Sequence, residues 1–165
     1  MTAYITSSNN SGKALIDKHV ENDLKKYKWH VKKDGYMYRN ASTEELRKGM
    51  PRSLSMHRQL MGFPEGKTID HINHDKLDNR LSNLRIATYS ENQANRRKLG
   101  NSSSKYKGVR YHRRDGVWHA YVVVKGKQKH LGTFKEEKEA AQAYNKAAEK
   151  YFGEFALLNI TEECV

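Results

Sequence analysis

Residues 68–96, TIDHINHDKLDNRLSNLRIATYSENQANR, contain the pattern that decides the fold of the first half of this chain. Two short extended runs, 67–71 and 84–87, flank a segment rich in turn-forming residues. Ser90 then begins a helix, with Gln93 as the reciprocal half of a capping box. The pattern therefore predicts two strands, a loop and a helix within about 30 residues.

Three polar residues of this stretch suggest hydrolytic chemistry. Asp70 and His71 are adjacent, so they can serve one site only at a strand end, where the chain twists. Asn92 falls in the first turn of the predicted helix, near a helix N-terminus that favours phosphate oxygens. Carboxylate and amide oxygens suit Mg²⁺ or Mn²⁺, and water and a substrate phosphate complete the octahedron. A neutral imidazole beside them can deprotonate the attacking water near neutral pH.

Several short motifs follow one another in a characteristic order. They are His57-Arg58, Asp70-His71, Leu77-Asp-Asn-Arg80, Ser82-Asn-Leu-Arg85 and Glu91-Asn-Gln-Ala-Asn95, with a hairpin over residues 29–38 upstream. Together they resemble the HNH endonuclease family with the ββα-metal fold, over residues 27–98. The likeness is greatest to phage and intron-encoded homing endonucleases, some of which are joined to Apetala-two/ERF-type domains. It implies an HNH endonuclease module over residues 25–98.

The resemblance also implies roles for individual residues. Asp70 and Asn92 would bind the metal, and His71 would be the general base. Asn83 would brace the loop that orients His71. The last family position is often histidine; here it is Asn92, or Asn95 if the register moves by one turn, and an amide oxygen disfavours zinc. The presence of all these residues favours an intact nuclease over an inactive HNH fold.

Other polar residues of this half have simpler interpretations. Asn79 is typical of a turn. His74 and His71 have a spacing compatible with zinc, but without a nearby cysteine the catalytic interpretation is favoured. For His57, a core histidine and a residue that supports the site stay equally open.

The second half of the chain has the pattern of a small sheet covered by a helix. Alternating runs at 108–112, 117–124 and 129–134 predict a three-stranded antiparallel sheet. A helix over 136–152 should follow and end at Gly153. Its expected apolar face consists of Ala140, Tyr144, Ala147 and Tyr151, with Ala141 and Ala148 beside them.

Charge separates the predicted sheet from the predicted helix. The chain has 31 Lys and Arg against 19 Asp and Glu, a net charge of +12 that points to a polyanionic partner. Residues 105–129 carry eight basic side chains and one acidic one, whereas lysines and glutamates balance over 135–151. This asymmetry favours contact with nucleic acid through the sheet. A polar segment, 99–104, is expected to link the two halves.

The second half resembles the Apetala-two/ERF DNA-binding domain over residues 105–160. The matching motifs are Tyr106-Lys-Gly-Val-Arg110, the Trp118 strand, Leu131-Gly-Thr-Phe134, Ala140-Ala141, Ala143-Tyr144 and Ala156-Leu-Leu-Asn159. The family places its three-stranded sheet in the DNA major groove. By position, the DNA-binding residues would be Lys107, Arg110, His112, Arg113, Tyr121, Val123 and His130. Val123 and His130 depart from the plant pattern, and Trp118 is expected to be a core residue.

The sequence thus predicts an α+β protein: a small ββα-metal HNH nuclease module, plus a three-stranded antiparallel sheet packed on one helix. The expected function is metal-dependent hydrolysis of double-stranded DNA by a monomer, with a DNA-binding regulator as the alternative. RNA binding fits the charge but lacks a clear pair of stacking aromatics.

The sequence also carries expectations about the location of the protein and about its N-terminal region. No apolar run approaches the roughly 20 residues that span a bilayer, and neither a secretory signal nor a disulfide is expected, since Cys164 is the single cysteine. A cytoplasmic location without membrane contact follows. Residues 1–24 suggest no role, although the charged stretch 13–28 is compatible with a helix.

Overall fold

The computed structural model describes residues 1–98, 100 and 103–161. The chain divides into two compact units, Met1–Ala87 (the N-terminal unit) and Thr88–Val165 (the C-terminal unit). The division falls just before the helix predicted at Ser90, upstream of the expected linker 99–104. Residues 99, 101 and 102 of that linker, like Cys164, lie outside the described residues.

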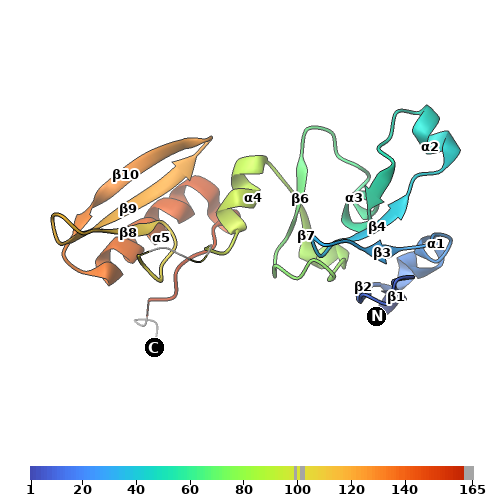
Figure 1. The fold of residues 1–165 in the computed structure, drawn as a ribbon, viewed down its shortest axis with the longest axis horizontal. Helices are drawn as coiled ribbons and strands as arrows, with labels where there is room; N and C mark the ends of the chain where they lie inside the picture. Colours follow the sequence, from blue (N-terminus) through green and yellow to red (C-terminus); the bar gives the residue numbers. More distant parts are fainter. Residues whose placement is uncertain (99, 101–102, 162–165) are drawn as a thin grey trace. The chain divides into compact units, whose positions relative to one another are not determined.

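Small antiparallel sheets and short helices build the N-terminal unit (Figure 1). Its strands are β1 (Thr2–Thr6), β2 (Lys13–Asp17), β3 (His30–Val31), β4 (Met37–Asn40), β5 (Ser53–Ser55), β6 (Thr68–His71) and β7 (Leu84–Ala87). They pair as β1-β2, β3-β4-β5 and β6-β7. Its helices are η1 (Lys18–Val20), α1 (Glu21–Leu24), α2 (Thr43–Arg47), α3 (Met56–Leu60) and η2 (Leu81–Asn83).

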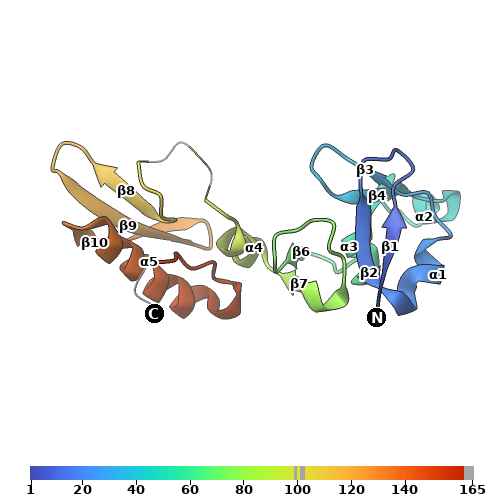
Figure 2. The ribbon, with the colours of Figure 1, turned by 90° about the horizontal axis from the view of Figure 1, so that it is seen from below.

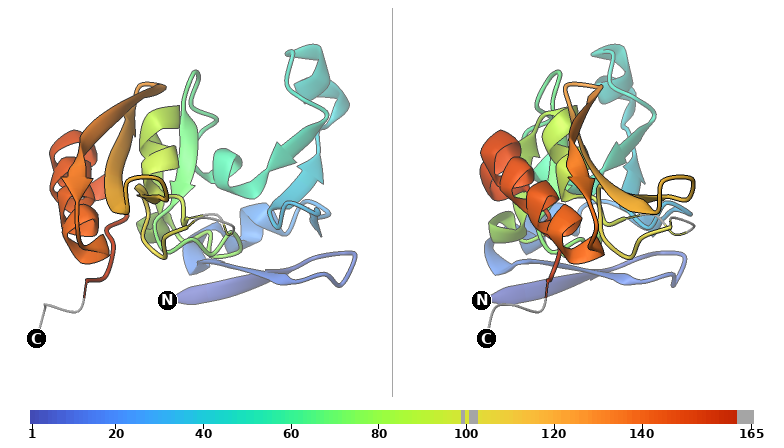
Figure 3. Two further views of the ribbon diagram at one scale, coloured as in Figure 1. Left: turned by 60° about the vertical axis from the view of Figure 1, so that its left-hand side comes forward. Right: turned by 90° about the vertical axis from the view of Figure 1, so that its left-hand side faces the viewer.

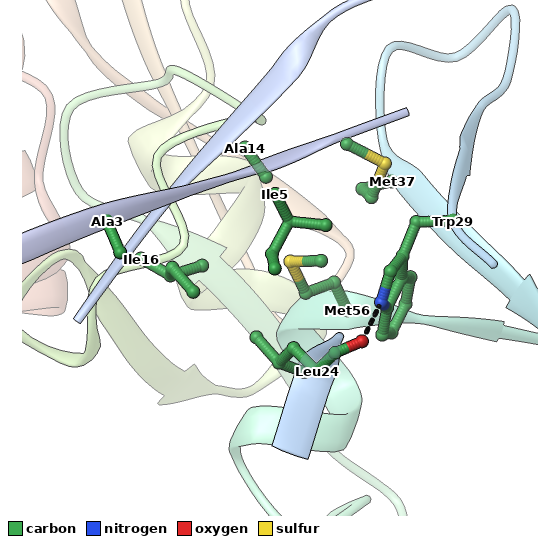
Figure 4. Packing of buried hydrophobic residues seen from close by; sticks show 8 residues of the cluster. All are labelled: Ala3, Ile5, Ala14, Ile16, Leu24, Trp29, Met37 and Met56. Atoms are coloured by element: carbon green, nitrogen blue, oxygen red, sulfur yellow. Dashed lines mark hydrogen bonds between the residues drawn. The ribbon is translucent and has the colours of Figure 1, made fainter. Parts of the chain in front are cut away.

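One apolar cluster joins the first 24 residues to the rest of this unit (Figure 4). It consists of Ala3, Ile5, Ala14, Ile16, Leu24, Trp29, Met37 and Met56. The indole of Trp29 is 1% exposed, and its Nε1 donates to the Leu24 carbonyl at 2.8 Å, as a buried indole N–H requires. Burial of these side chains supplies the main hydrophobic stabilisation of the unit.

The cluster corrects two expectations for the N-terminal region. Residues 1–24 are part of the N-terminal unit's core and not a separate segment. Within the stretch 13–28, residues Lys13–Asp17 form a strand because Ala14 and Ile16 alternate with more exposed neighbours and pair with β1. Only the short α1 and η1 are helical there.

The C-terminal unit is a three-stranded sheet with helices. Its elements are α4 (Tyr89–Asn95), β8 (Val109–His112), β9 (Val117–Val124), β10 (Lys127–Phe134), α5 (Glu137–Phe152) and η3 (Gly153–Phe155). The strands pair in the order β10-β9-β8, with a bulge between His130 and Gly132. The helix α5 lies along one face of the sheet (Figure 2), and a view turned about the vertical axis shows the same arrangement (Figure 3).

Small side chains let α5 approach the sheet closely. Its buried residues are Ala140, Ala141, Tyr144, Ala148 and Phe152. Phe152 therefore takes the buried place that the sequence assigned to Tyr151, whose ring is 39% exposed and lies under the Lys129 ammonium. Gly153 ends the helix at φ 51°, as predicted. Trp118 packs with this core, as expected.

The predicted fold class is confirmed in both units. The strands β6 and β7 followed by α4, and the sheet β8–β10 with α5, are the elements that the hydrophobic pattern predicted. None of the described helices combines the length and apolar character needed to cross a membrane.

Candidate active site and nucleic-acid interface

The end of β6 carries the predicted carboxylate and imidazole. In the β6–β7 pairing, Asp70 lies opposite Arg85, and His71, the last residue of β6, lies opposite Leu84. Asp70 and His71 are each 5% exposed. The structure thus gives the adjacent pair the strand-end position that a shared site requires.

The side chain of Asn83 holds the loop that follows His71. Its Oδ1 accepts from the Asn73 backbone N–H at 3.0 Å, and its Nδ2 donates to Asn73 Oδ1 at 3.0 Å and to the Asp78 carbonyl at 2.8 Å. Its own carbonyl accepts from Ile72, the residue after His71, at 3.0 Å. The buried Asn83 amide therefore ties the start of the loop, at Asn73, to Asp78 farther along it, and such hydrogen-bonded buried amides rigidify their surroundings.

The strand β2 fixes the far side of the same loop. Leu15 donates to the Leu77 carbonyl and accepts from the Asn79 backbone N–H, both at 2.8 Å. The Asp17 carboxylate accepts from the Leu81 N–H at 2.8 Å. Asn79, for which the sequence favoured a turn, is 1% exposed and therefore fully buried. The first 24 residues thus support the loop that follows His71.

Aromatic rings surround His71. The ring of His57 lies 5.2 Å away in an edge-on arrangement, and the ring of Tyr36 lies 5.6 Å away. Burial lowers the pKa of His71, opposed by a hydrogen bond to Asn79 and by nearby carboxylates including Asp70. A neutral imidazole is the form that accepts a proton, so the surroundings favour a base at neutral pH.

His57 is a partly buried histidine whose ring contacts that of His71. Its Nε2 lies 3.2 Å from Ser55 Oγ, and its Nδ1 has no hydrogen-bond partner among the described residues. Burial lowers the pKa of His57 to about 3, with smaller contributions from His71 and Arg58. The ring contact places His57 beside His71, which is compatible with either interpretation that the sequence left open for His57.

Acid should destabilise the N-terminal unit through His57. The folded-state pKa of His57, about 3, lies below the ordinary value of 6.5, so between these pH values the unfolded chain binds more protons. Stability is therefore fully present above pH 6.5 and should fall by about 1 kcal/mol per pH unit below it. Urea unfolding at several pH values, followed by Trp29 fluorescence in a Trp118→Phe background, measures this slope. His57→Gln should flatten the slope, and an unchanged slope would show that His57 is not responsible.

Asp70 supplies a carboxylate suited to a hard metal ion. Arg85 donates to Asp70 Oδ2 from Nε at 2.9 Å and lies 2.8 Å from it through Nη2. Among the described residues, no three His, Cys, Asp or Glu side chains gather into a metal cluster. A metal on Asp70 would therefore need amide, water or phosphate oxygens as its other ligands, which matches Mg²⁺ or Mn²⁺ better than zinc.

The N-cap of α4 lies two residues earlier than predicted, and a different capping box begins the helix. Thr88 is the N-cap: its Oγ1 accepts from the Glu91 N–H at 3.3 Å, and the Glu91 carboxylate accepts from the Thr88 N–H at 2.7 Å. Ser90 and Gln93 therefore do not form the cap. Asn92 lies in the first turn, where its N–H donates to the Thr88 carbonyl, and Asn95 lies three residues on. Both belong to the C-terminal unit.

The sheet face opposite α5 presents a group of rings and one guanidinium. We call it the reading face; its residues are Arg110, His112, His119, Tyr121, Val123 and His130. The ring of His119 lies 5.2 Å from those of His112 and His130, and Tyr121 lies 5.1 Å from His130. Arg110 pairs with His119, and Tyr121 with His130, across the strands.

His119 lies on the reading face but is not among the DNA-binding residues predicted from the sequence. The spacing indicates its position: residues two apart in a strand share a face, and Tyr121 and Val123 are predicted DNA-binding residues on that face. His119 lies at the centre of the ring group, and its Nδ1 is 3.0 Å from the Tyr121 hydroxyl.

Lys107 is not on the reading face. It precedes β8, and its Nζ donates to carbonyls at the end of α4: Gln93 at 3.3 Å, Arg96 at 2.7 Å, and Ala94. Burial lowers the pKa of Lys107 to about 8, with a smaller effect of Arg96. In this structure the ammonium is bound to the protein's own backbone, which favours a structural role for Lys107 over the predicted DNA contact. Arg113 is exposed in the turn after β8.

Comparison with known proteins identifies the family. The HNH endonuclease family model matches residues 58–94. An uncharacterised HNH endonuclease of Acanthamoeba polyphaga mimivirus is 37% identical over 142 residues, 82% of this chain and 68% of that protein. The chain belongs to the HNH endonuclease family. Protein 3.8 of Escherichia phage T7 is 35% identical over 66 residues, 40% of this chain and 54% of that protein.

The second half of this HNH endonuclease matches a different family model. The AP2 domain model covers residues 104–154. The AP2-like ethylene-responsive transcription factor TOE2 of Arabidopsis thaliana is 42% identical over 64 residues, 39% of this chain but 13% of that protein. Both resemblances seen in the sequence are therefore confirmed. No solved structure matches the chain.

Proposed function

We propose that this protein hydrolyses phosphodiester bonds of double-stranded DNA in a metal-dependent reaction that leaves 5′-phosphate and 3′-hydroxyl ends. The observation that carries the proposal is the buried imidazole of His71, next to Asp70 at the end of β6 and held by the Asn83 network. The AP2 domain would bind the site that is cut. DNA as the substrate implies action inside the cell, in the cytoplasm.

Each residue has one task in this reaction. His71 accepts a proton from water positioned opposite the leaving 3′ oxygen, and Asn83 keeps His71 in place through the loop. Asp70 and Asn92 would hold Mg²⁺ or Mn²⁺, with Asn95 as the alternative to Asn92. When bound, the metal supplies Lewis-acid stabilisation of the charge on the scissile phosphate. Arg85 keeps the Asp70 carboxylate oriented through their ion pair.

Supercoiled plasmid DNA tests the function directly. The purified chain is incubated with it in Mg²⁺, in Mn²⁺ and in EDTA. Metal-dependent conversion to nicked circles is expected for a monomer with one active site, whereas linear product would indicate paired action. Absence of cleavage on DNA that the protein demonstrably binds would favour the alternative, a DNA-binding regulator with an inactive HNH fold.

Replacing Arg110 should weaken DNA binding. Arg110 is exposed on the reading face, in the most basic part of the chain, and a phosphate or base contact through it is lost in Arg110→Ala. We expect affinity to fall roughly 10-fold and the slope of log K against log salt to shrink by about 0.9. Binding titrations at several salt concentrations measure both. Lys146→Ala, which removes an exposed cation from α5, is the matched control, and equal effects of the two variants would move the DNA contact off the sheet.

A further inference from the structure

The helix α4 lies within the HNH family match but folds with the AP2 domain. The family model extends to residue 94, whereas the compact unit that contains α4 begins at Thr88. The helix has seven residues, too few to be stable in water without tertiary contacts. The tertiary contacts that hold α4 therefore also set the position of Asn92.

Apolar packing and backbone contacts attach α4 to the sheet and α5. Ala94 belongs to a buried cluster with Val122, Tyr144, Ala148 and Phe152. The Ala94 carbonyl accepts from the Leu157 N–H at 3.3 Å, and Ser90 Oγ accepts from the Lys125 N–H at 3.3 Å. These are contacts to the strands and to the segment after α5, so the AP2 domain holds α4 at both of its ends.

The strongest polar attachment is Lys107. Its ammonium binds the carbonyls of Gln93, Ala94 and Arg96 at the C-terminal end of α4, where helix carbonyls run out of intrahelical donors. The Gln93 carbonyl also accepts from the Arg96 N–H at 3.2 Å. A cation there also complements the helix dipole. Moreover, the carbonyl and N–H of Lys107 bond the Asn159 side chain, so its backbone is fixed in the same domain.

We propose that Lys107 is a positioning residue for cleavage: the AP2 domain, through Lys107, holds the nuclease helix α4 and with it Asn92. This inference rests on the proposed function, in which Asn92 is a metal ligand. It assigns two separate tasks to two cations of one short segment. Arg110 binds DNA, and Lys107 organises the helix of the active site.

The test compares Lys107→Met with Arg110→Met in the full-length chain. Lys107→Met keeps the aliphatic stem and removes the ammonium. We expect hydrogen exchange to lose protection about 10-fold in α4 alone, with the β9 amides unchanged. The cleavage kcat should fall about 10- to 100-fold, as for residues that orient metal ligands, with DNA affinity in EDTA unchanged. Arg110→Met should show the opposite pattern: its DNA affinity should fall, and the hydrogen-exchange protection of α4 should stay unchanged.

Two results would overturn the inference. One is normal α4 protection in Lys107→Met, and the other is a loss of DNA affinity equal to that of Arg110→Met. If Lys107→Met loses β9 protection and so fails to fold, Lys107→Gln, which keeps N–H donors, decides by the same measurements. If the wild-type chain cuts no DNA, the proposed function fails, and the exchange measurement alone still decides whether Lys107 holds α4.

Discussion

Replacing His71 by alanine is expected to slow DNA cleavage about 10²- to 10⁴-fold, the usual contribution of a positioned general base. The imidazole is buried between Tyr36 and His57, and burial lowers its pKa, so at neutral pH it is ready to accept a proton. Plasmid cleavage under single-turnover conditions measures the effect. DNA affinity in EDTA should stay unchanged, since the reading face lies in the other unit.

The matched control is His74→Asn, in the same loop. His74 has φ 67°, a left-handed conformation that asparagine tolerates well, so this variant removes an imidazole with little backbone strain. It should cut at nearly the wild-type rate. Wild-type cleavage by His71→Ala would refute the assignment of the base, and equal losses in both variants would show that loop integrity is being measured.

Replacing Gly108 by alanine should destabilise the C-terminal unit by about 3–5 kcal/mol, the combined cost of a left-handed alanine and an overpacked core. Gly108 has φ +73°, and a Cβ there would lie 2.0 Å from Tyr144 Cδ2 and 2.6 Å from the Tyr121 carbonyl oxygen. The ring of Tyr144 is buried in the cluster with Val122, Ala148 and Phe152, so moving it away from a new Cβ would disturb that packing. Because domains are stable by only about 5–15 kcal/mol, a large part of the unit's stability would be lost.

Gly126→Ala separates the steric cost from the backbone cost. Gly126 has φ +75°, but among the described residues no atom lies within 4 Å of the position that a Cβ would take, so only about 1 kcal/mol is expected. Urea unfolding followed by the amide NMR signals of β9 measures both variants. Equal losses in the free energy of unfolding for Gly108→Ala and Gly126→Ala would mean that the contact with Tyr144 does not destabilise the unit.

Most elements of both families could be predicted from local patterns. The alternation in β9 and the spacing of alanines in α5 specify their faces, because a strand repeats every two residues and a helix every 3.6. The strand-end position of Asp70 and His71 followed from their adjacency. The β1–β2 hairpin was not predicted, because only two side chains of each short strand are buried (Ala3 and Ile5 in β1, Ala14 and Ile16 in β2), too few for a clear periodic signal.

The sequence by itself determined the two families, the basic sheet and the carboxylate–imidazole pair, since these depend on residue identity and short-range spacing. Only the tertiary structure decided the partners of long side chains. Lys107 stands three residues before Arg110, yet its ammonium binds the end of α4 while Arg110 is exposed on the reading face. Likewise, Asn79 is buried because β2, far earlier in the chain, pairs with its backbone. Such contacts join segments that are distant in the chain, and local sequence patterns carry no information about which of them meet.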